Sequence, residues 1–210
     1  MAFNVLKMDL IEAILKRRDT RHFLTDEVPD EILKEAIETA SHAPSVGLSE
    51  PWRFIIVKEK EIKQKIKLLF EESSNLASTQ INNEEQKNKY NTLKLEGILE
   101  APIGIVIFCD YNSANDFTIG TVTQKREMLL CSTACAIQNM WLYLTSKGYG
   151  MGWVSIIDFD KLKTLFDVPT DWFPLGYFCI GKPATNYDGK PMLVNKGWKE
   201  KNDINSTTIF

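Results

Sequence analysis

The sequence lacks the features of several common protein classes. It contains no apolar run close to the roughly 20 residues that a transmembrane helix needs, and its first residues have no basic start followed by an apolar block. The 210 residues carry a formal net charge of −3 and no basic stripe, which argues against a nucleic-acid-binding protein. We therefore expect a cytoplasmic protein that spans no membrane and binds no nucleic acid.

Metal-binding and common nucleotide-binding motifs are also missing. The two histidines have no zinc-site spacing, and no GxGxxG or GxxxxGK(S/T) pattern is present. The four cysteines lie in apolar surroundings, which favours reduced thiols that pack as small hydrophobic side chains. These cysteines are Cys109, Cys131, Cys135 and Cys179. We expect no bound metal and no thiol redox chemistry.

Hydrophobic periodicity predicts helices and strands that do not alternate strictly. Helical spacing marks residues 9–18, 30–43, 60–70, 125–147 and 158–166. Short apolar runs predict strands at 52–57, 103–109, 151–157 and 173–180. The helix at 125–147 is apolar nearly all round, which is typical of a central helix buried on most faces. The pattern favours an α+β fold.

Two segments have little apolar periodicity. Residues 71–92 are rich in Ser, Asn, Gln, Glu and Lys, which predicts a mobile excursion, a lid or a polar helix. Residues 184–210 have no period but carry aromatic side chains, which favours a tail lying on a second subunit. Because no linker or internal repeat divides the chain, we predict one domain over residues 1–210.

Positive charge is concentrated where the first predicted helix ends. The cluster consists of Arg17, Arg18, Asp19, Thr20 and Arg21. It follows an apolar stripe formed by Leu10, Ile11, Ile14 and Leu15. An arginine fork can hold two phosphate oxygens, so the cluster favours a phosphate ligand. The alternative is a solvated helix end whose cations face the C-terminal helix dipole.

Six short segments, in order along the chain, carry further motifs. They are residues 17–21, 42–47 with 51–52, 93–98, 135–141, 152–156 and 196–198. Together they resemble the nitroreductase flavoprotein superfamily, and most of all its 5,6-dimethylbenzimidazole synthases. The resemblance covers nearly the whole chain. It implies a nitroreductase-like mixed sheet flanked by helices, and a homodimer with a swapped C-terminal tail that binds FMN at the subunit interface.

The resemblance also implies which residues contact FMN. They are Arg17, Arg18, Asp19, Thr20, Arg21, Pro44, Ser45, Val46, Gly47, Lys94, Leu95, Gly152, Trp153, Val154 and Ser155. The three arginines would hold the phosphate and ribityl chain. The small residues at 44–47 would let backbone amides approach the ring, although a plain helix-to-strand loop explains them equally well. Lys94 and Leu95 would lie over the flavin or under a lid formed by residues 71–92, or be ordinary helix residues.

Two residues receive catalytic roles from the resemblance. The Ser155 hydroxyl would lie near flavin N5 and tune it, although a serine that ends a strand commonly bonds to backbone. Asp19 matches an aspartate implicated as a general acid/base, although a carboxylate between arginines is commonly a structural ion-pair partner. We expect the neighbouring cations to depress the pKa of Asp19, which suits a base more than an acid.

The reaction of this subgroup consumes its flavin. Reduced FMN is the substrate and molecular oxygen the co-substrate. The products are 5,6-dimethylbenzimidazole, the lower ligand of vitamin B12, and erythrose 4-phosphate. NAD(P)H or a separate flavin reductase would supply the electrons.

The chain departs from the subgroup before its long helix. The synthases usually show Gly-Arg and then Met-Asp-x-Tyr-Ser, but residues 120–121 and 128–132 lack the arginine, the acid and the tyrosine. Glu50 also replaces a glutamine. Two alternatives therefore stay open. One is an FMN-dependent NAD(P)H nitroreductase or reductive dehalogenase that retains its flavin, and the other is a non-catalytic flavin-binding protein.

Overall fold

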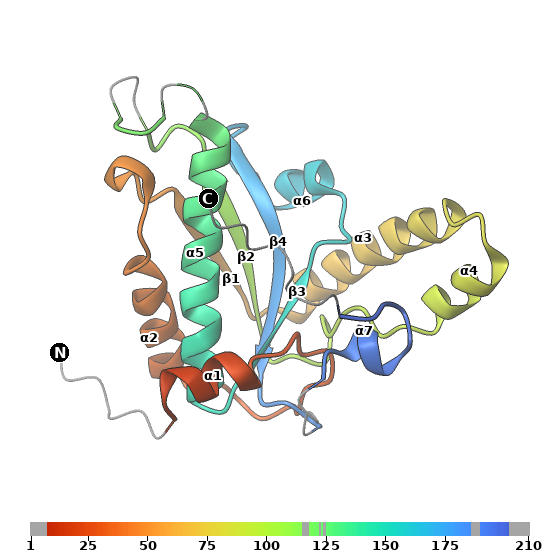
Figure 1. The fold of residues 1–210 in the computed structure, drawn as a ribbon. Helices are drawn as coiled ribbons and strands as arrows, with labels where there is room; N and C mark the ends of the chain where they lie inside the picture. The colour runs from red at the N-terminus through yellow and green to blue at the C-terminus, as the bar shows by residue number, and fades with distance from the viewer. Residues whose placement is uncertain (1–7, 115–117, 122, 124, 186–189, 202–210) are drawn as a thin grey trace, which may run out of the picture.

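One antiparallel sheet, with helices on both faces, organises the chain (Figure 1). A computed structural model describes residues 8–114, 118–121, 123, 125–185 and 190–201. The strands are β1 (Trp52–Val57), β2 (Ile103–Asp110), β3 (Gly150–Val154) and β4 (Trp172–Gly181). The helices are α1 (Leu10–Lys16), α2 (Asp30–Ser41), α3 (Lys60–Thr79), α4 (Glu84–Asn91), α5 (Lys125–Ser146), α6 (Phe159–Phe166) and α7 (Met192–Asn195). A short 3-10 turn, η1, covers Val46–Leu48.

The strand order is β1-β2-β4-β3, and the predicted α+β class is confirmed. The expectation of a mixed sheet is wrong for the described strands, because β1–β2, β2–β4 and β3–β4 all pair antiparallel. Apolar periodicity predicts where strands lie along the chain, but it does not predict whether neighbouring strands run parallel or antiparallel. The described residues do contain an isolated parallel bridge, between Asp19 and Met151.

Strand β2 separates two hydrophobic cores. Ile105 and Ile107 point into the core shared with α2 and α5, whereas Val106 and Phe108 point into the core shared with α3 and α6. Successive strand residues face opposite sides of a sheet, so a strand covered on both faces is a continuous apolar run. This explains why the sequence located β2 so clearly.

Helix α5 packs on the sheet along one side and leaves its other side open. Its end is capped at Gly148, whose φ of 80° suits glycine, and the Tyr149 N–H donates to the Leu144 carbonyl at 2.9 Å. Cys131 and Cys135 lie on the open side and are exposed, so the expectation that all four thiols pack internally is wrong for these two. A helix that is apolar all round still meets the sheet on one face only.

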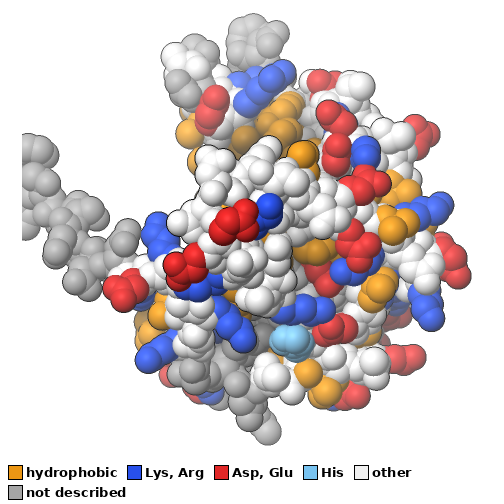
Figure 2. Space-filling view, turned by 90° about the vertical axis from the view of Figure 1, so that its right-hand side faces the viewer, with side chains coloured by type: hydrophobic (Ala, Val, Ile, Leu, Met, Phe, Trp, Pro, Cys, Tyr) orange, Lys and Arg blue, Asp and Glu red, His pale blue; other side chains and the backbone are white. Residues whose placement is uncertain are grey.

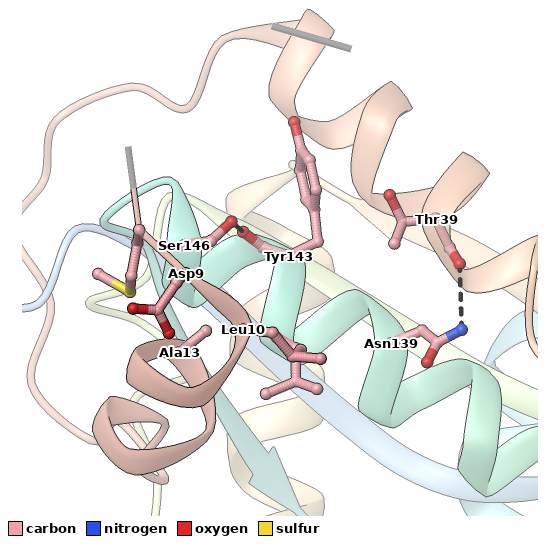
Figure 3. A pocket seen from close by; sticks show the side chains of 9 residues that line it. Asp9, Leu10, Ala13, Thr39, Asn139, Tyr143 and Ser146 are labelled. Carbon is pink, nitrogen blue, oxygen red and sulfur yellow. Dashed lines mark hydrogen bonds between the residues drawn. The ribbon is translucent and has the colours of Figure 1, made fainter. Parts of the chain in front are cut away.

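Helix α1 also turns its apolar stripe outward. Leu10, Ile11 and Leu15 are each about two-thirds exposed and Ile14 nearly half, whereas Ala13 is the buried residue of the helix. Beside this stripe a cavity of about 300 Å³ opens between α1, α2 and α5 (Figure 3). Soluble chains rarely leave so many large apolar side chains of one element in water.

The described residues 190–201 lie beside helix α4 of the polar segment 71–92 (Figure 1). Residues 71–92 form the end of α3 and all of α4, which confirms the helical interpretation, and a lid formed by these residues stays a prediction. The described tail residues 190–201 include α7 and contact α4 of the same chain through Trp198 and Gly197. A tail placed on a partner subunit stays a prediction, and residues 202–210 lie outside the described part. Within the described residues, no helix combines the length and apolar character that crossing a bilayer requires.

Candidate functional site

The segment after α1 runs alongside β3 in the same direction. The Thr20 N–H donates to the Met151 carbonyl at 3.0 Å, next to the parallel bridge between Asp19 and Met151. The approach is so close that a methyl group at Gly150 would strike the Thr20 side chain, and one at Gly152 would strike the Thr20 carbonyl. The alternating glycines of β3 therefore allow the arginine cluster to lie against the sheet.

The Asp19 carboxylate is fixed from two sides. Its Oδ1 accepts from the Trp153 N–H at 2.8 Å, and its Oδ2 pairs with the Arg21 guanidinium. Burial raises the pKa of this carboxyl, and Arg21, the Trp153 amide and Arg17 oppose that rise only in part. The expectation of a depressed pKa is therefore wrong, because desolvation outweighs the cations. A carboxyl with a raised pKa can both donate and accept a proton closer to neutral pH.

Arg21 carries unused hydrogen-bonding capacity. Its Nη2 donates to the Trp153 carbonyl at 2.9 Å, but Nε and Nη1 are buried and have no partner among the residues that the structure describes. A buried cation with idle donors is costly unless an anion or water reaches them. Arg17, the residue directly after α1, packs against α5, with its guanidinium carbon 4.6 Å from the centre of the Trp141 ring.

Arg18 and Thr20 face a different space from Arg17 and Arg21. They line a cavity of about 510 Å³ together with Lys16, Tyr149 and Lys182. Neighbouring residues of an extended segment point to opposite sides, which accounts for the division. The predicted cluster of three arginines is thus one segment with two cationic faces.

The three residues that follow Gly152 differ in whether their side chains are available to a ligand. The Trp153 indole donates to the Leu175 carbonyl at 2.7 Å and packs on Phe178, and Val154 is buried in the core. These two residues therefore offer backbone groups to a ligand. Ser155 is exposed just beyond β3, about 7 Å along the strand from the Trp153 amide that holds Asp19.

Residues 44–47 lie at the opposite end of α5 (Figure 1). The Val46 N–H donates to Ser132 Oγ at 3.0 Å, and Gly47 has a φ of 54° that few other residues adopt. Ser132 and Trp141, the contacts of the two segments on α5, are nine residues or about 13 Å apart along the helix. One chain therefore does not bring residues 44–47 against Arg17.

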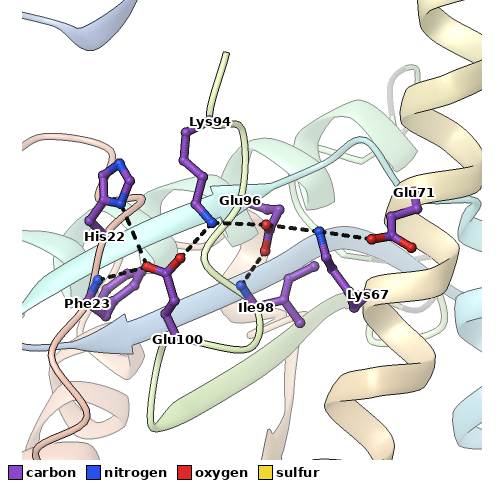
Figure 4. A network of polar contacts seen from close by, with 8 residues as sticks. All are labelled: His22, Phe23, Lys67, Glu71, Lys94, Glu96, Ile98 and Glu100. Atoms are coloured by element: carbon purple, nitrogen blue, oxygen red, sulfur yellow. Dashed lines mark hydrogen bonds and ion pairs between the residues drawn. The ribbon is translucent and has the colours of Figure 1, made fainter. Parts of the chain in front are cut away.

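Lys94 is held in a chain of alternating charges (Figure 4). Its Nζ lies 2.7 Å from Glu100 and 3.3 Å from Glu96. Glu96 also accepts from Lys67 of α3 at 3.1 Å, and Glu100 reaches the backbone N–H of Phe23 at 3.4 Å. Leu95 packs against the core shared with α3 and α6. The chain of charges thus links Lys94 both to α3 and to the residues directly after Arg21.

The sequence interpretation missed Glu96. Its side chain is 7% exposed and accepts from the Ile98 N–H at 2.7 Å. Burial acts to raise the pKa of Glu96, but the Ile98 amide, Lys94 and Lys67 together lower it below its usual value. The alternating charges at residues 94, 96 and 100 could have indicated ion pairs in this loop. The partner Lys67, which lies far away in the sequence, could not be predicted from that pattern.

The arginine segment and the strand it lies against belong to a region that matches a known protein family. The Nitroreductase family profile matches residues 14–182, which include the arginine segment, all four strands and the residues after β3. The chain belongs to the nitroreductase family. As a member of this family it is a flavin-dependent oxidoreductase.

Named proteins and solved structures are similar to this chain over most of its length. The 5,6-dimethylbenzimidazole synthase of Rhodospirillum rubrum is 35% identical over 194 residues, covering 92% of this chain and 90% of that protein. Among solved structures, an iodotyrosine deiodinase bound to FMN and 3-iodo-L-tyrosine has a TM-score of 0.74 at 20% identity, covering 96% of this chain and 100% of that one. A BluB-like flavoprotein from Clostridium difficile 630 has a TM-score of 0.70 at 20% identity, covering 97% and 99%. The structural likenesses show the fold.

The residues present fit a flavin mononucleotide. The idle, buried donors of Arg21 are suited to an anion, whereas Lys16, Arg18 and Lys182 place positive charge around the cavity on the other side of the segment. The glycines of β3 keep side chains away from the segment that carries Asp19. A phosphate or a polar chain bound at Arg21 would therefore lie beside the Asp19 carboxylate, which pairs with the same guanidinium.

Proposed function

We propose that the protein is a 5,6-dimethylbenzimidazole synthase that fragments reduced FMN in an oxygen-dependent reaction. The products would be 5,6-dimethylbenzimidazole, the lower ligand of vitamin B12, and erythrose 4-phosphate. The observation that carries the proposal is the Asp19 carboxylate, held between the Trp153 amide and Arg21 with a raised pKa. Identity of 35% with a relative of that name, over most of both chains, supports the choice of reaction.

The roles of the residues follow from their positions. Arg17 and Arg21, which lie on one face of the segment, bind the phosphate and ribityl chain, and the backbone of β3 lines the flavin as far as Ser155. Arg18, which was also expected there, faces the cavity on the other side of the segment. Bound reduced FMN supplies the electrons and the atoms of the product. Asp19 accepts and returns protons beside it, because its raised pKa makes it a better proton acceptor than an ordinary aspartate. NAD(P)H, directly or through a separate flavin reductase, reduces the FMN.

The site is completed by a second copy of the chain. Residues 44–47 contact α5 about 13 Å along the helix from the Arg17 contact of their own chain, so they would not touch the same end of a bound FMN, and we expect a partner's loop at the flavin. The outward apolar stripe of α1 and the open side of α5 provide the surface for such a homodimer. Analytical ultracentrifugation should show a dimer, and Ile11→Glu should shift it toward monomer and weaken FMN binding. A monomeric wild type that binds FMN tightly would contradict this assembly.

Product analysis tests the reaction. Purified protein is incubated with FMN and a chemical reductant, in air and under argon, and the products are identified by mass. We expect 5,6-dimethylbenzimidazole and loss of FMN in air only. Recovery of all the FMN intact in air would reject the proposal.

The retained-flavin alternative gives the opposite result in the same assay. A nitroreductase or reductive dehalogenase would turn over a nitroaromatic or halogenated phenol many times with its FMN conserved. The changes at residues 120–121 and 128–132, close to the Ser132 contact with Val46, are the observation that favours it. A non-catalytic flavin-binding protein would give neither product.

A further inference from the structure

The Lys196, Gly197 and Trp198 motif has no part in the proposed FMN contacts, yet it has a defined place in the fold. At the end of α7, the Gly197 N–H donates to Val194 at 2.9 Å and the Trp198 N–H donates to Leu193 at 2.8 Å. Gly197 has a φ of 62°, which glycine adopts at low cost. This tight turn fixes the direction in which Trp198 leaves the helix.

The turn presents Trp198 to α4. The Trp198 and Tyr90 rings are tilted with their centres 6.1 Å apart, and Lys89 Nζ donates to the Gly197 carbonyl at 2.8 Å. The Tyr90 hydroxyl continues the contact to Ser74 of α3 at 3.1 Å. Because α4 has no fully buried residue, these contacts form a large part of what holds it.

Helices α3 and α4 enclose a cavity of about 570 Å³ together with residues 93–96. Lys94 and Leu95, which the FMN proposal uses, belong to its wall, and so does Tyr90. The volume lies in the usual range of small-molecule sites. Figure 2 looks at this side of the molecule, where acidic and basic side chains are interspersed. No large patch of one sign is visible there, so individual ion pairs and packing contacts hold the helices in place.

Helix α3 is held by its packing in the core and by the ion pair between Glu72 and Lys161, and Ser78 donates to Asn91 of α4. Two further contacts tie the α3–α4 hairpin to the wall of the cavity and to the C-terminal segment. Its base is tied to the Lys94 loop by the ion pair between Lys67 and Glu96 (Figure 4), and its outer helix is tied to the C-terminal segment by Tyr90 and Trp198. The ion pair at the base is largely buried, because the Glu96 and Lys67 side chains are only 7% and 24% exposed. The outer contact joins the half-buried rings of Tyr90 and Trp198. Opening of the cavity thus has to begin at the outer contact.

We propose that residues 196–198 form a clasp that holds α4 over this cavity, and that Trp198 is a positioning residue for the site beneath. The clasp limits how fast a ligand enters and leaves the space beside Lys94. Its effect on FMN rests on the proposed function, whereas its effect on α4 does not.

Hydrogen exchange of the α4 amides in the full-length protein tests the clasp directly. Aromatic pairs contribute about 0.5–1.5 kcal/mol beyond their buried area, which converts to about two- to tenfold in an opening equilibrium. We expect Trp198→Ala and Tyr90→Ala each to speed exchange over residues 84–91 by at least that factor. The double variant should show little further change, because both remove the same contact.

A lysine pair on one helix supplies a matched control. Lys89→Met removes the bond to the Gly197 carbonyl and should speed α4 exchange, whereas Lys87→Met, with no such bond among the described residues, should not. In stopped-flow measurements the FMN dissociation rate should rise two- to tenfold for Trp198→Ala and stay unchanged for Lys87→Met.

The outcomes separate the clasp from the proposed reaction. Unchanged α4 exchange in Trp198→Ala overturns the clasp, whatever the protein catalyses. Faster α4 exchange with an unchanged FMN dissociation rate overturns its role at the site. If the wild type binds FMN without fragmenting it, the synthase proposal fails while both clasp measurements still apply. If it binds no FMN, α4 exchange alone decides.

Discussion

Gly152→Ala is the substitution that most directly probes how the arginine segment is seated. The added methyl group would lie inside contact distance of the Thr20 carbonyl oxygen, which belongs to backbone and cannot rotate away. Carbon–oxygen contacts settle near 3.3–3.6 Å, so the segment would have to move by about 1 Å. That movement would loosen the bonds from Thr20 to Met151, from Trp153 to Asp19 and from Arg21 to Trp153.

The magnitude follows from those three hydrogen bonds. At about 0.5–1.5 kcal/mol net each, the loosened junction costs about 2–4 kcal/mol of folding free energy. A misplaced arginine forfeits about 1.5–3 kcal/mol of phosphate binding, which weakens FMN affinity about ten- to a hundredfold. Thermal unfolding and titration of FMN fluorescence measure the two effects.

A second strand glycine provides the control. In Gly181→Ala the new methyl group would lie 2.7 Å from Pro102 Cδ, so it strains packing at the end of β4 without entering the contacts of Asp19. We expect this variant to lose stability and keep its FMN affinity. If Gly152→Ala bound FMN as tightly as the wild type, the seating of the segment against β3 would not matter for the flavin, and this reasoning would be refuted.

Three further predictions follow from the same residues. Asp19→Asn should lower product formation about a hundredfold, with FMN affinity changed only a few-fold because an amide oxygen still accepts from Trp153; undiminished turnover would remove Asp19 from the chemistry. Arg21→Gln should weaken FMN binding about tenfold or more, whereas Lys58→Gln, whose partner is Asp30, should leave it unchanged in the same titration. Glu96→Gln should lower the free energy of unfolding at pH 7 by about 3 kcal/mol. Because the pKa of Glu96 is lowered on folding, its ionised form contributes stability above pH 4.5 that is lost as the pH falls through the folded-state pKa. The variant should therefore lose less stability than the wild type in urea titrations below pH 4.5, and parallel pH profiles would contradict this.

Helices and strands could be predicted from the sequence where neighbouring residues share the same surroundings in the fold. Strand β1 is predicted at 52–57 and is found there. A short apolar run with β-branched residues is typical of a buried strand. The helix predicted over 158–166 is found as α6, and the Asp158 side chain accepts from two amides at its start. Local chemistry decides such features.

Features that depend on distant contacts were not accessible in this way. The outward direction of Leu10, Ile11 and Leu15 contradicts the usual meaning of an apolar stripe, since a helix pattern does not say what the helix packs against. The pKa of Asp19 was misjudged because the sequence shows adjacent cations but not desolvation. The separation of residues 44–47 from Arg17 appears only once α5 is in place.

The most direct test of the central claim is a crystal structure of the protein with FMN. We predict a two-subunit assembly in which one FMN molecule contacts Arg17 and Arg21 at its phosphate and ribityl end and Ser155 at its flavin ring, with the Asp19 carboxylate beside it. Electron density for FMN at any other place, or an FMN whose phosphate lies away from residues 17–21, would contradict the account.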